Sequence, residues 1–374
     1  MHARRLLTAA LSLATGLSIA LPGVAANARD HAEGAFLKTN LVSDVPGMAP
    51  VIDSNLINPW GISAGPTTPM WVSDNNAGVT TVYDGAGNPF QVGPPAFPAG
   101  PLVVKIPKSD GSPGGAPTGT VFNDTADFSS DGFLFATEDG TIAGWKLSDV
   151  EQARIEVHNP AVDTGPVYKG LAIGNNGSAN HLYAANFRAG TIDVFDANFA
   201  PVSLSGSFTD NQLPPEFSPF NIQNLAGKLY VTYALPKAGR HDDMAGPGNG
   251  FVDVFDLNGH LLRRLVKHGA LNSPWGLALA PENFGPFSGA LLVGNFGDGR
   301  INAYSPKSGR FIGTIRDETG TPIHTDGLWG IRFGNGSNGG GALAPRNTLY
   351  FAAGIFEEQH GLFGKITSVG ENDN

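Results

Sequence analysis

The segment 271–310 reads LNSPWGLALAPENFGPFSGALLVGNFGDGRINAYSPKSGR. Its Ser-Pro-Trp-Gly start at 273–276 leads into an apolar run, and two further apolar runs, 291–295 and 301–304, follow residues that favour turns. Short apolar runs separated by Gly, Pro and Asn are typical of antiparallel strands. We predict three strands here and a fourth at 311–315. Such a unit cannot bury both of its faces alone, so it needs copies of itself on either side.

The chain contains six copies of this opening. They lie at 58–62, 117–121, 168–171, 218–222, 273–277 and 327–331. From Gly61 to Gly330 is 269 residues, which five intervals divide into about 54 residues each, slightly more than in common propeller repeats. Six units of four strands predict an all-β fold, a six-bladed β-propeller with four-stranded antiparallel blades. We interpret the Trp residues of the openings as core that fills the gaps between blades.

The two ends of the chain are predicted to close the ring. Residues 36–43 read as a lone strand without a hairpin partner, and the last blade, near 350–352 and 362–366, lacks an outer strand of its own. Pairing of the N-terminal strand in the last blade supplies the missing strand. It also covers an edge that would otherwise be open to aggregation.

Residues 1–28 resemble a secretory signal peptide. They start with an arginine pair, continue with the apolar stretch 6–21 and end in the cleavage pattern Ala26-Asn27-Ala28. We therefore expect residues 1–28 to be removed and 29–374 to form a single propeller domain of a secreted or periplasmic protein. No other segment is apolar enough to cross a bilayer, so no membrane span is expected after signal removal.

Charge and cysteine content narrow the possible partners. The chain has 23 basic and 33 acidic residues, a formal net charge of −10; residues 1–28 hold two arginines and no acid, so the mature charge is −12. An acidic chain argues against nucleic acid as a partner. Without cysteine there are no disulfides, and stability must come from blade packing and ring closure. We expect a monomer.

Candidate site residues gather on one face of the predicted ring. In a propeller, the loops that lead into the innermost strands and the loops that join the second and third strands emerge on the same side, around the channel mouth. The candidates for ligand binding in these loops are Asp74, Asn75, Asn186, Arg188, His241, Asp242, Asp243, Asn295, Asp298 and Glu357. Convergent polar groups on an otherwise apolar ring are typical of a ligand pocket.

Structural roles compete with ligand binding for several of these residues. Asp74, Asn186 and Asn295 each lie four residues before a glycine, where Asp and Asn commonly hydrogen-bond the backbone of their own turn. A ring of Asp and Asn oxygens could instead hold Ca²⁺ in the channel, because this ion prefers several oxygen ligands. No contiguous calcium-loop spacing is present, so no cofactor is evident from the sequence.

Two long insertions interrupt the repeat. The first, 234–250, contains His241-Asp242-Asp243, which could supply a general base or metal ligands, or form a solvated loop surface. The second, 334–347, is rich in Gly and Asn. We expect both insertions on or near the channel-mouth face, with 234–250 as its lid or rim.

The motifs of several enzyme classes are absent. The sequence has no Gly-x-Ser-x-Gly elbow, no Walker loop, no His-Glu-x-x-His zinc motif and no cysteine nucleophile. Catalytic residues therefore stay unassigned.

Six distinctive motifs are distributed along the chain. They are NLVSD at 40–44, NPWG at 58–61, HDD at 241–243 with GPGNGFVDVFD at 246–256, LNSPWGLA at 271–278, GNFGDG at 294–299 and HGLFG at 360–364. Together they resemble an uncharacterised family of exported bacterial propellers over nearly the whole mature chain. The architecture is similar to NHL-repeat, TolB-like and SMP-30/gluconolactonase-like propellers. The resemblance implies a six-bladed fold and export, but no established activity and no catalytic residues.

Two functions follow as hypotheses. The first is an exported scaffold that binds a protein, peptide or glycan ligand through its channel-mouth loops. The alternative is a metal-dependent hydrolase or lactonase with a Ca²⁺-type ion in the channel. We favour binding, because no acid–base pair of known geometry is present and a fold alone does not assign chemistry.

Overall fold

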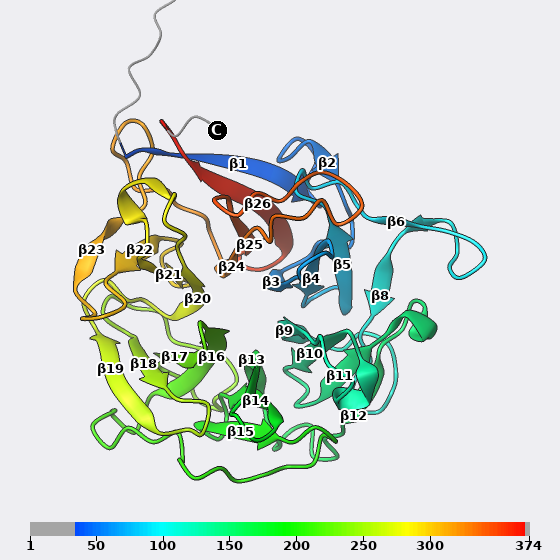
Figure 1. Ribbon diagram of the computed structural model, residues 1–374, viewed down its shortest axis with the longest axis horizontal. Helices are drawn as coiled ribbons and strands as arrows, with labels where there is room; N and C mark the ends of the chain where they lie inside the picture. Colours follow the sequence, from blue (N-terminus) through cyan, green and yellow to red (C-terminus); the bar gives the residue numbers. More distant parts are fainter. Residues whose placement is uncertain (1–33, 371–374) are drawn as a thin grey trace, which may run out of the picture. The chain divides into compact units, whose positions relative to one another are not determined.

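The computed structural model describes residues 34–370, which form six sheets around a central channel (Figure 1). This arrangement confirms the predicted six-bladed β-propeller. The predicted signal peptide at 1–28 lies outside the described residues. Besides strands, the described chain has three short 3-10 segments, η1 (Phe128–Ser130), η2 (Leu147–Asp149) and η3 (Gly285–Phe287). None of its helices has the length and apolar character needed to cross a membrane.

Four blades follow the predicted pattern of four antiparallel strands, ordered from the channel outward. Blade 1 contains β3 (Pro59–Ser63), β4 (Met70–Asp74), β5 (Val79–Tyr83) and β8 (Val103–Lys105). Blade 2 contains β9 (Pro117–Phe122), β10 (Phe133–Thr137), β11 (Ile142–Trp145) and β12 (Arg154–Val157). Blade 4 contains β16 (Ser218–Leu225), β17 (Lys228–Ala234), β18 (Phe251–Phe255) and β19 (Leu261–Lys267). Blade 5 contains β20 (Pro274–Leu279), β21 (Leu291–Asn295), β22 (Ile301–Tyr304) and β23 (Phe311–Thr314).

Blade 3 has three strands, β13 (Tyr168–Asn175), β14 (Asn180–Asn186) and β15 (Thr191–Phe195). The segment after β15 makes only an isolated bridge between Phe195 and Pro201. Proline cannot donate a ladder hydrogen bond, which explains why no fourth strand forms there. A small hairpin of β6 (Gln91–Val92) and β7 (Gly100–Pro101) projects from blade 1.

Blade 6 joins the two ends of the chain and closes the ring, as predicted. It contains β24 (Leu328–Phe333), β25 (Leu349–Ile355) and β26 (His360–Ser368), then β1 (Phe36–Ser43) and the short β2 (Val51–Ile52). Strand β1 pairs antiparallel with β26, from Phe36 opposite Ser368 to Ser43 opposite Leu362. The outer edge of β26 is therefore covered.

One residue near the start of each innermost strand points toward the channel. These residues are Trp60, Thr118, Lys169, Phe220, Trp275 and Trp329. The rings of Trp60 and Trp329 stack with centroids 3.5 Å apart, and Trp275 meets both rings edge-on at about 6 Å. All three are nearly fully buried. The prediction that these Trp residues are core between blades agrees with the stacking of Trp60 of blade 1 on Trp329 of blade 6, and with Trp275 the two rings also form an aromatic plug in the channel.

A glycine after the plug residue lets neighbouring inner strands approach closely. A Cβ atom at Gly276 would lie 2.8 Å from the Trp329 carbonyl oxygen, and one at Gly330 would overlap the Trp60 carbonyl oxygen. Blade 4 has Asn221 at this position, and its Nδ2 donates a hydrogen bond of 2.7 Å to the Trp275 carbonyl oxygen. The Trp-Gly pattern of the sequence thus reflects backbone contact around the channel.

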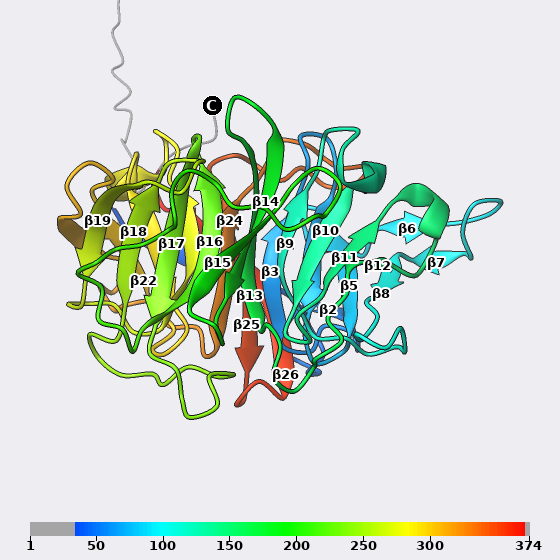
Figure 2. The same ribbon diagram turned by 90° about the horizontal axis from the view of Figure 1, so that it is seen from below.

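The two long insertions lie on opposite faces. The first connects β17 to β18 and emerges where the innermost strands begin, a side that we call the mouth face; Figure 2 shows the ring edge-on, with the β25–β26 turn projecting on this side. The insertion 334–347 connects β24 to β25 and therefore emerges on the opposite face. The expectation that both insertions lie near the channel mouth is wrong for 334–347, because a loop between a first and a second strand leaves from the other end of the blade.

The closure predicts a large difference between two adjacent side chains of β1. Phe36 is 1% exposed and stacks on Phe287 with centroids 5.6 Å apart, whereas Leu37 is 52% exposed. Phe36→Ala should lower the free energy of unfolding by about 3–5 kcal/mol, as for other buried Phe deletions. Leu37→Ala should change it by less than about 0.5 kcal/mol. Urea denaturation monitored by Trp fluorescence measures both, and equal effects would contradict the role of β1 as the closing strand.

Candidate functional site

A cavity of about 290 Å³ lies at the channel mouth, directly against the aromatic plug. Polar and aromatic side chains from all six blades line it: Asn58, Trp60, Asn75, Asn76, Glu138, Lys169, Lys237, Asp242, Asp243, Phe296, Trp329, Glu357, Glu358 and Gln359.

Lys169 is the charged centre of this cavity. It is the second residue of the innermost strand of blade 3, at the position where three other blades have Trp, and its side chain is only 3% exposed. Its Nζ forms an ion pair with Glu138 and lies 4.9 Å from the centroid of the Trp60 ring. An ammonium over an indole face is favourable, and more so where water is excluded.

Glu138 follows β10 and is held from two sides. One carboxylate oxygen accepts from Lys169, and the other accepts from Asn75 Nδ2 at 3.0 Å. Burial alone would raise the pKa of Glu138, but the charges of Lys169 and His241 and these hydrogen bonds outweigh it, so the pKa lies below its usual value. Glu138 is therefore ionised at neutral pH.

The β17–β18 loop forms the rim of the cavity. An isolated bridge between Pro236 and Asp243 folds it back on itself, and Arg240 Nε donates to the Arg188 carbonyl oxygen at 2.8 Å. Gly246 N also donates to Asn272 Oδ1 at 2.7 Å, which ties the loop to blade 5. The predicted role of this insertion as a rim agrees with this placement.

His241 and Asp242 lie at the outer edge of the rim. His241 Nδ1 is 2.8 Å from Asp242 Oδ1 and 3.9 Å from Glu138 Oε1. The hydrogen bond from His241 lowers the pKa of Asp242 to about 2. One ligand atom from each of Glu138, His241 and Asp242 lies within 4.8 Å of the others, so these three groups could hold a metal ion.

Two carboxyl groups deeper in the cavity resist ionisation. Asp243 is 6% exposed, and its Oδ2 is buried without a hydrogen-bond partner among the described residues. Burial raises the pKa of Asp243. Burial also raises the pKa of Glu358, with further contributions from the charges of Glu138 and Asp243. Lys169 is the partner of Glu138, so negative charge is in excess at the mouth.

The structure brings together six of the ten predicted site residues. Asn75, Asp242, Asp243 and Glu357 line the mouth cavity. Asn75, Arg188 and His241 line a neighbouring groove of about 680 Å³ that also includes Glu138. The two hollows meet at Asn75 and Glu138, so they form one continuous polar surface on the mouth face.

The other four predicted residues lie in turns and sheets and line neither hollow. Asp74 is fully buried, accepts from Thr81 Oγ1 at 2.8 Å, and burial raises its pKa well above the usual range. Asn186 Oδ1 accepts from Ala189 N at 3.1 Å within its own turn. Asn295 Nδ2 donates to the Ala270 carbonyl oxygen at 2.8 Å and to Asp298 Oδ1 at 3.0 Å. Only the contact of Asn186 is the predicted bond to the backbone of its own turn; Asp74 and Asn295 are instead bonded to a neighbouring strand and to another loop.

Three important side chains were not selected as site residues from the sequence: Glu138, Lys169 and Glu358. A signal for two of them exists in the repeat. Lys169 replaces the aromatic plug residue, and Glu138 occupies the position that holds Phe187 in blade 3 and Phe296 in blade 5. Both residues are charged at repeat positions that are aromatic in other blades, and aligning the six units by sequence would have identified them.

Comparison with known proteins identifies relatives of this chain. It is 33% identical to uncharacterised protein R648 of Acanthamoeba polyphaga mimivirus, over 87% of this chain and 78% of that protein. It is 34% identical to uncharacterised protein L690 of the same virus, over 87% of this chain and 84% of that protein. The chain belongs to their family. No family model matches it. These relatives are viral, so they do not support the expectation of a bacterial family, and they carry no assigned activity.

Solved structures share the fold of this family member at low sequence identity. The aldose sugar dehydrogenase of Escherichia coli superposes with a TM-score of 0.53 at 13% identity, covering 89% of this chain and all of that one. A streptogramin B lyase superposes with a TM-score of 0.50 at 13% identity, covering 90% of this chain and 98% of that one. At this identity the likeness shows the propeller fold and not an activity.

The Lys169–Glu138 pair predicts a pH-dependent loss of stability. Lys169→Met leaves Glu138 buried without its cation, which should cost about 3 kcal/mol at pH 7. In the wild type the lowered pKa of Glu138 adds stability above its ordinary value of 4.5, and this stability is lost as pH falls. Without Lys169 the pKa rises, so acidification protonates Glu138 and removes the penalty.

Thermal melting of wild type and Lys169→Met at pH 7 and pH 4.5 tests this prediction. The difference in melting temperature should shrink at the lower pH, and Lys169→Met with Glu138→Gln should recover part of the loss at pH 7. Lys228→Met, on the exposed start of β17, is the matched control and should melt like the wild type at both pH values. A difference that is constant with pH would contradict a buried charge as its cause.

Proposed function

We propose that this chain is a ligand-binding propeller whose channel mouth takes a positively charged group of a protein, peptide or glycan ligand. The observation that carries the proposal is the excess of carboxylates around the mouth cavity. After Glu138 and Lys169 are paired, the remaining ionisable lining residues are Asp242, Asp243, Glu357, Glu358 and a single cation, Lys237.

The ionisation of Asp243 and Glu358 links the excess of carboxylates to cation binding. Their raised pKa values mean that ionisation of both is unfavourable in the empty cavity. A ligand cation would stabilise the ionised forms, so binding and ionisation would support each other. The buried Asp243 Oδ2 has only the nearby Ser273 hydroxyl as a potential partner among the described residues, so it could also accept from a ligand ammonium.

The shape of the cavity supports a small charged group rather than a large one. About 290 Å³ is near the lower end of ligand pockets and accommodates one side chain or one sugar residue. Phe296 and Trp329 would cover an apolar stem or sugar face, while Asn58 and Gln359 offer amide groups. The rest of the ligand would lie along the neighbouring groove at Arg188 and His241. If residues 1–28 act as a signal, as we propose, this ligand is met outside the cytoplasm.

A second candidate function rests on the cluster of Glu138, His241 and Asp242. Three ligands of this kind leave positions for water and substrate on a divalent ion, as in metal-dependent hydrolases or lactonases. Calcium, the ion expected from the sequence, prefers oxygen and would gain only part of its coordination here. Lys169 already neutralises Glu138, which lowers the attraction for a second cation. We therefore rank this function below cation binding.

The binding proposal predicts discrimination between charged and capped ligands. Titration calorimetry with trilysine and its acetylated form, and with a glucosamine trimer and its N-acetylated form, should give heat only for the free amines. Asp243→Asn and Glu358→Gln should each weaken binding about 10-fold, the loss of about 1.4 kcal/mol. Acidification should weaken wild-type binding early, since acids with raised pKa values protonate first.

Glu282→Gln is the matched control for these substitutions. Glu282 is exposed in the β20–β21 loop of the opposite face, so the variant should bind like the wild type. Equal binding of amine and acetylated probes, or full affinity in both acid-to-amide variants, would refute the proposed cation site.

The metal-dependent alternative has its own test. We expect protein purified without chelator to hold less than one equivalent of divalent ion, and EDTA to leave its melting temperature unchanged. Elemental analysis together with melting before and after EDTA measures both quantities. One tightly held ion, lost with EDTA and required for ester or lactone cleavage, would place the enzyme ahead of the binding propeller.

A further inference from the structure

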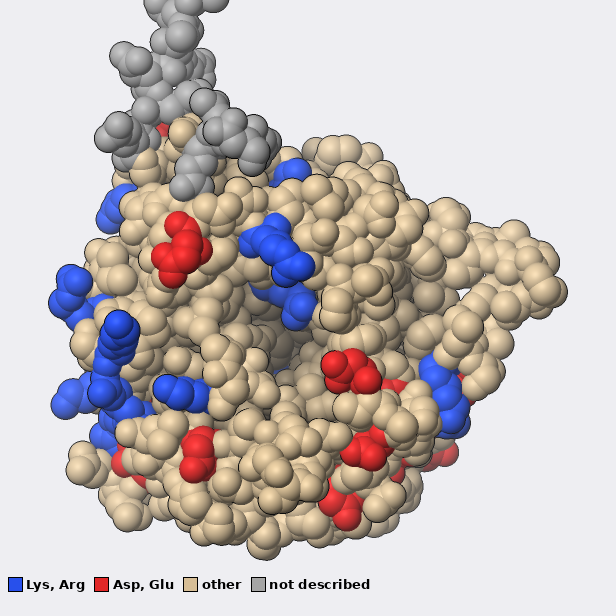
Figure 3. Space-filling view, viewed as in Figure 1, with Lys and Arg blue, Asp and Glu red and all other residues tan. Residues whose placement is uncertain are grey.

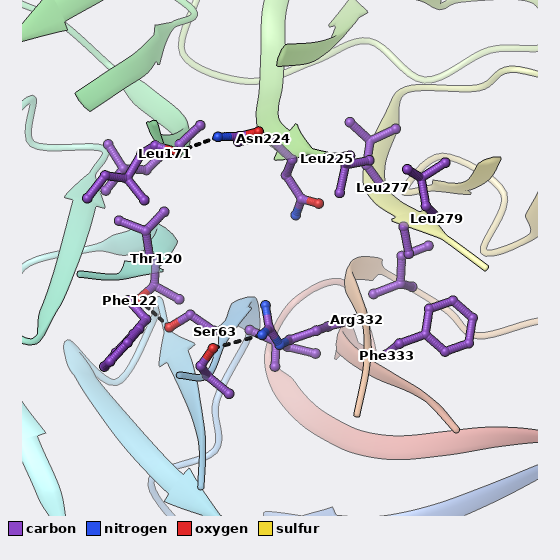
Figure 4. Close-up of a pocket in the computed structure, with 18 of the residues that line it drawn as sticks. Ser63, Thr120, Phe122, Leu171, Asn224, Leu225, Leu277, Leu279, Arg332 and Phe333 are labelled. Carbon is purple, nitrogen blue, oxygen red and sulfur yellow. Dashed lines mark hydrogen bonds between the residues drawn. The ribbon is translucent and has the colours of Figure 1, made fainter. Parts of the chain in front are cut away.

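A second and larger cavity lies at the other end of the channel. It encloses about 580 Å³ and is lined by the later residues of the six innermost strands, such as Ile62, Leu171, Leu277, Ile331 and Phe333 (Figure 4). The aromatic plug separates it from the mouth cavity, because the plug residues precede these positions on each strand. The space-filling view shows the hollow at the centre of the ring (Figure 3).

Arg332 is the only charged residue in this lining. Its position in β24 corresponds to Ser63, Val121, Ala172, Gln223 and Ala278 in the other blades, none of which carries a charge. Figure 4 shows its side chain extending along the wall toward Ser63 of blade 1. A charge here is thus a departure from the repeat, as Lys169 is at the plug.

The guanidinium of Arg332 has few partners among the described residues. Its Nη2 donates to the Ala64 carbonyl oxygen at 2.8 Å, and its Nε is buried without any hydrogen-bond partner. No acidic side chain lines the cavity in the described part of the chain. Burial lowers the pKa of Arg332 to about 10, so it stays charged at neutral pH. Arg332 is only partly buried, but it has no counter-ion in the described lining, so an anion that binds it would gain charge-assisted hydrogen bonds.

We propose that this cavity binds an amphiphilic carboxylate, with its carboxylate on Arg332 and its apolar body against the Leu, Ile and Phe side chains. Arginine has five N–H donors in a planar fork that matches a carboxylate, and among the described residues only one of those of Arg332 has a partner. The volume of about 580 Å³ lies within the range of pockets for small organic ligands. The neutral amide of Gln223 lies on the same lining and can accept or donate to the headgroup.

Arg332 is the expected partner of the ligand carboxylate, because most other polar groups of the lining are hydrogen-bonded within the protein. Ser63 Oγ and Thr120 Oγ1 lie 3.0 Å apart and are bonded to each other. Asn224 Nδ2 donates to the Ile173 carbonyl oxygen at 2.9 Å. Their hydrogen bonds are largely used within the protein. The free binding capacity of the lining is therefore the Arg332 cation and the Gln223 amide beside apolar side chains, which favours one anionic group on an apolar body.

The experiment compares ligands that differ only in the headgroup. Delipidated full-length protein is titrated by calorimetry with decanoate, decanol and decyltrimethylammonium, each below the concentration at which it aggregates. Decanoate should bind with a stoichiometry near one, and the alcohol and the ammonium should bind at least about 10-fold more weakly. Shortening decanoate to octanoate and hexanoate should weaken binding about three- to fourfold per methylene removed.

Substitutions at Arg332 separate a binding role from a structural one. Arg332→Met should fold and lose about 10- to 100-fold in affinity for decanoate with little change for decanol. Arg332→Lys, which keeps the charge but not the fork, should lie between the wild type and Arg332→Met. Arg346→Gln, on the exposed 334–347 loop of the same face, is the matched control and should bind like the wild type.

Three results would overturn the proposal. They are equal affinity for decanoate and decanol, unchanged decanoate binding in Arg332→Met, and no saturable decanoate binding in the wild type. Should Arg332→Met fail to melt cooperatively, the Arg332→Lys comparison and the headgroup series decide in the same way. The amine probes of the mouth cavity serve as an independent reference, since loss of one site should leave the other intact.

Discussion

The pairing of β1 with β26 is the constraint on which the rest of this molecule depends. It joins residues more than 300 positions apart and gives blade 6 its outer strands. Phe36, at the start of β1, also packs on Phe284 and Phe287 of blade 5, so the closing strand is fixed to two blades. The stacked rings of Trp60 and Trp329 lie across the seam between blades 1 and 6. Opening the seam would therefore also disrupt the aromatic plug in the channel.

The plug explains where polar chemistry is possible in an otherwise apolar ring. Four blades place an aromatic side chain near the start of the inner strand, whereas blades 2 and 3 place Thr118 and Lys169 there. Glycines in five blades, including the two polar ones, and Asn221 in blade 4 let neighbouring inner strands lie close together. Glu138 then pairs with Lys169 in a rigid setting, and the site forms where the repeat is broken.

The sequence was sufficient for the fold because the fold is repeated. The Pro-Trp-Gly pattern, the spacing of the units and the lone N-terminal strand predicted the six blades and their closure. The pattern alone did not reveal that Trp60, Trp275 and Trp329 point into the channel, since ring direction depends on how closely the inner strands approach. The predicted location of the 334–347 loop was wrong, because this loop connects the first and second strands of blade 6 and therefore lies on the face opposite the mouth. Blade 3 has no fourth strand, because the segment after β15 contains Pro201, which cannot donate a ladder hydrogen bond. This local effect is not part of the repeat pattern.

The site was less predictable than the fold, for a physical reason. The sequence identified four loop residues on the correct face: His241, Asp242, Asp243 and Asn75. Their charge state and their ability to bind a ligand depend on partners that are distant in the sequence. Lys169 reaches Glu138 from a different blade, and the burial that raises the pKa of Asp243 comes from a loop folded across two blades. Arg332 gave no motif at all. Arg332 indicates a binding site only when the six inner strands are aligned and the equivalent positions of the other five blades prove to be uncharged.

The two ends of the channel now present opposite chemistry on one scaffold. The mouth has excess carboxylate and one paired lysine, and the opposite cavity has one unpaired arginine in an apolar lining. The buried rings of the plug lie between them, in the same layer as the buried Thr118 and Lys169. Coupling between the ends would require movement of the Trp60–Trp329 stack, which the glycine contacts of the inner strands resist. Binding at one end should therefore be independent of binding at the other.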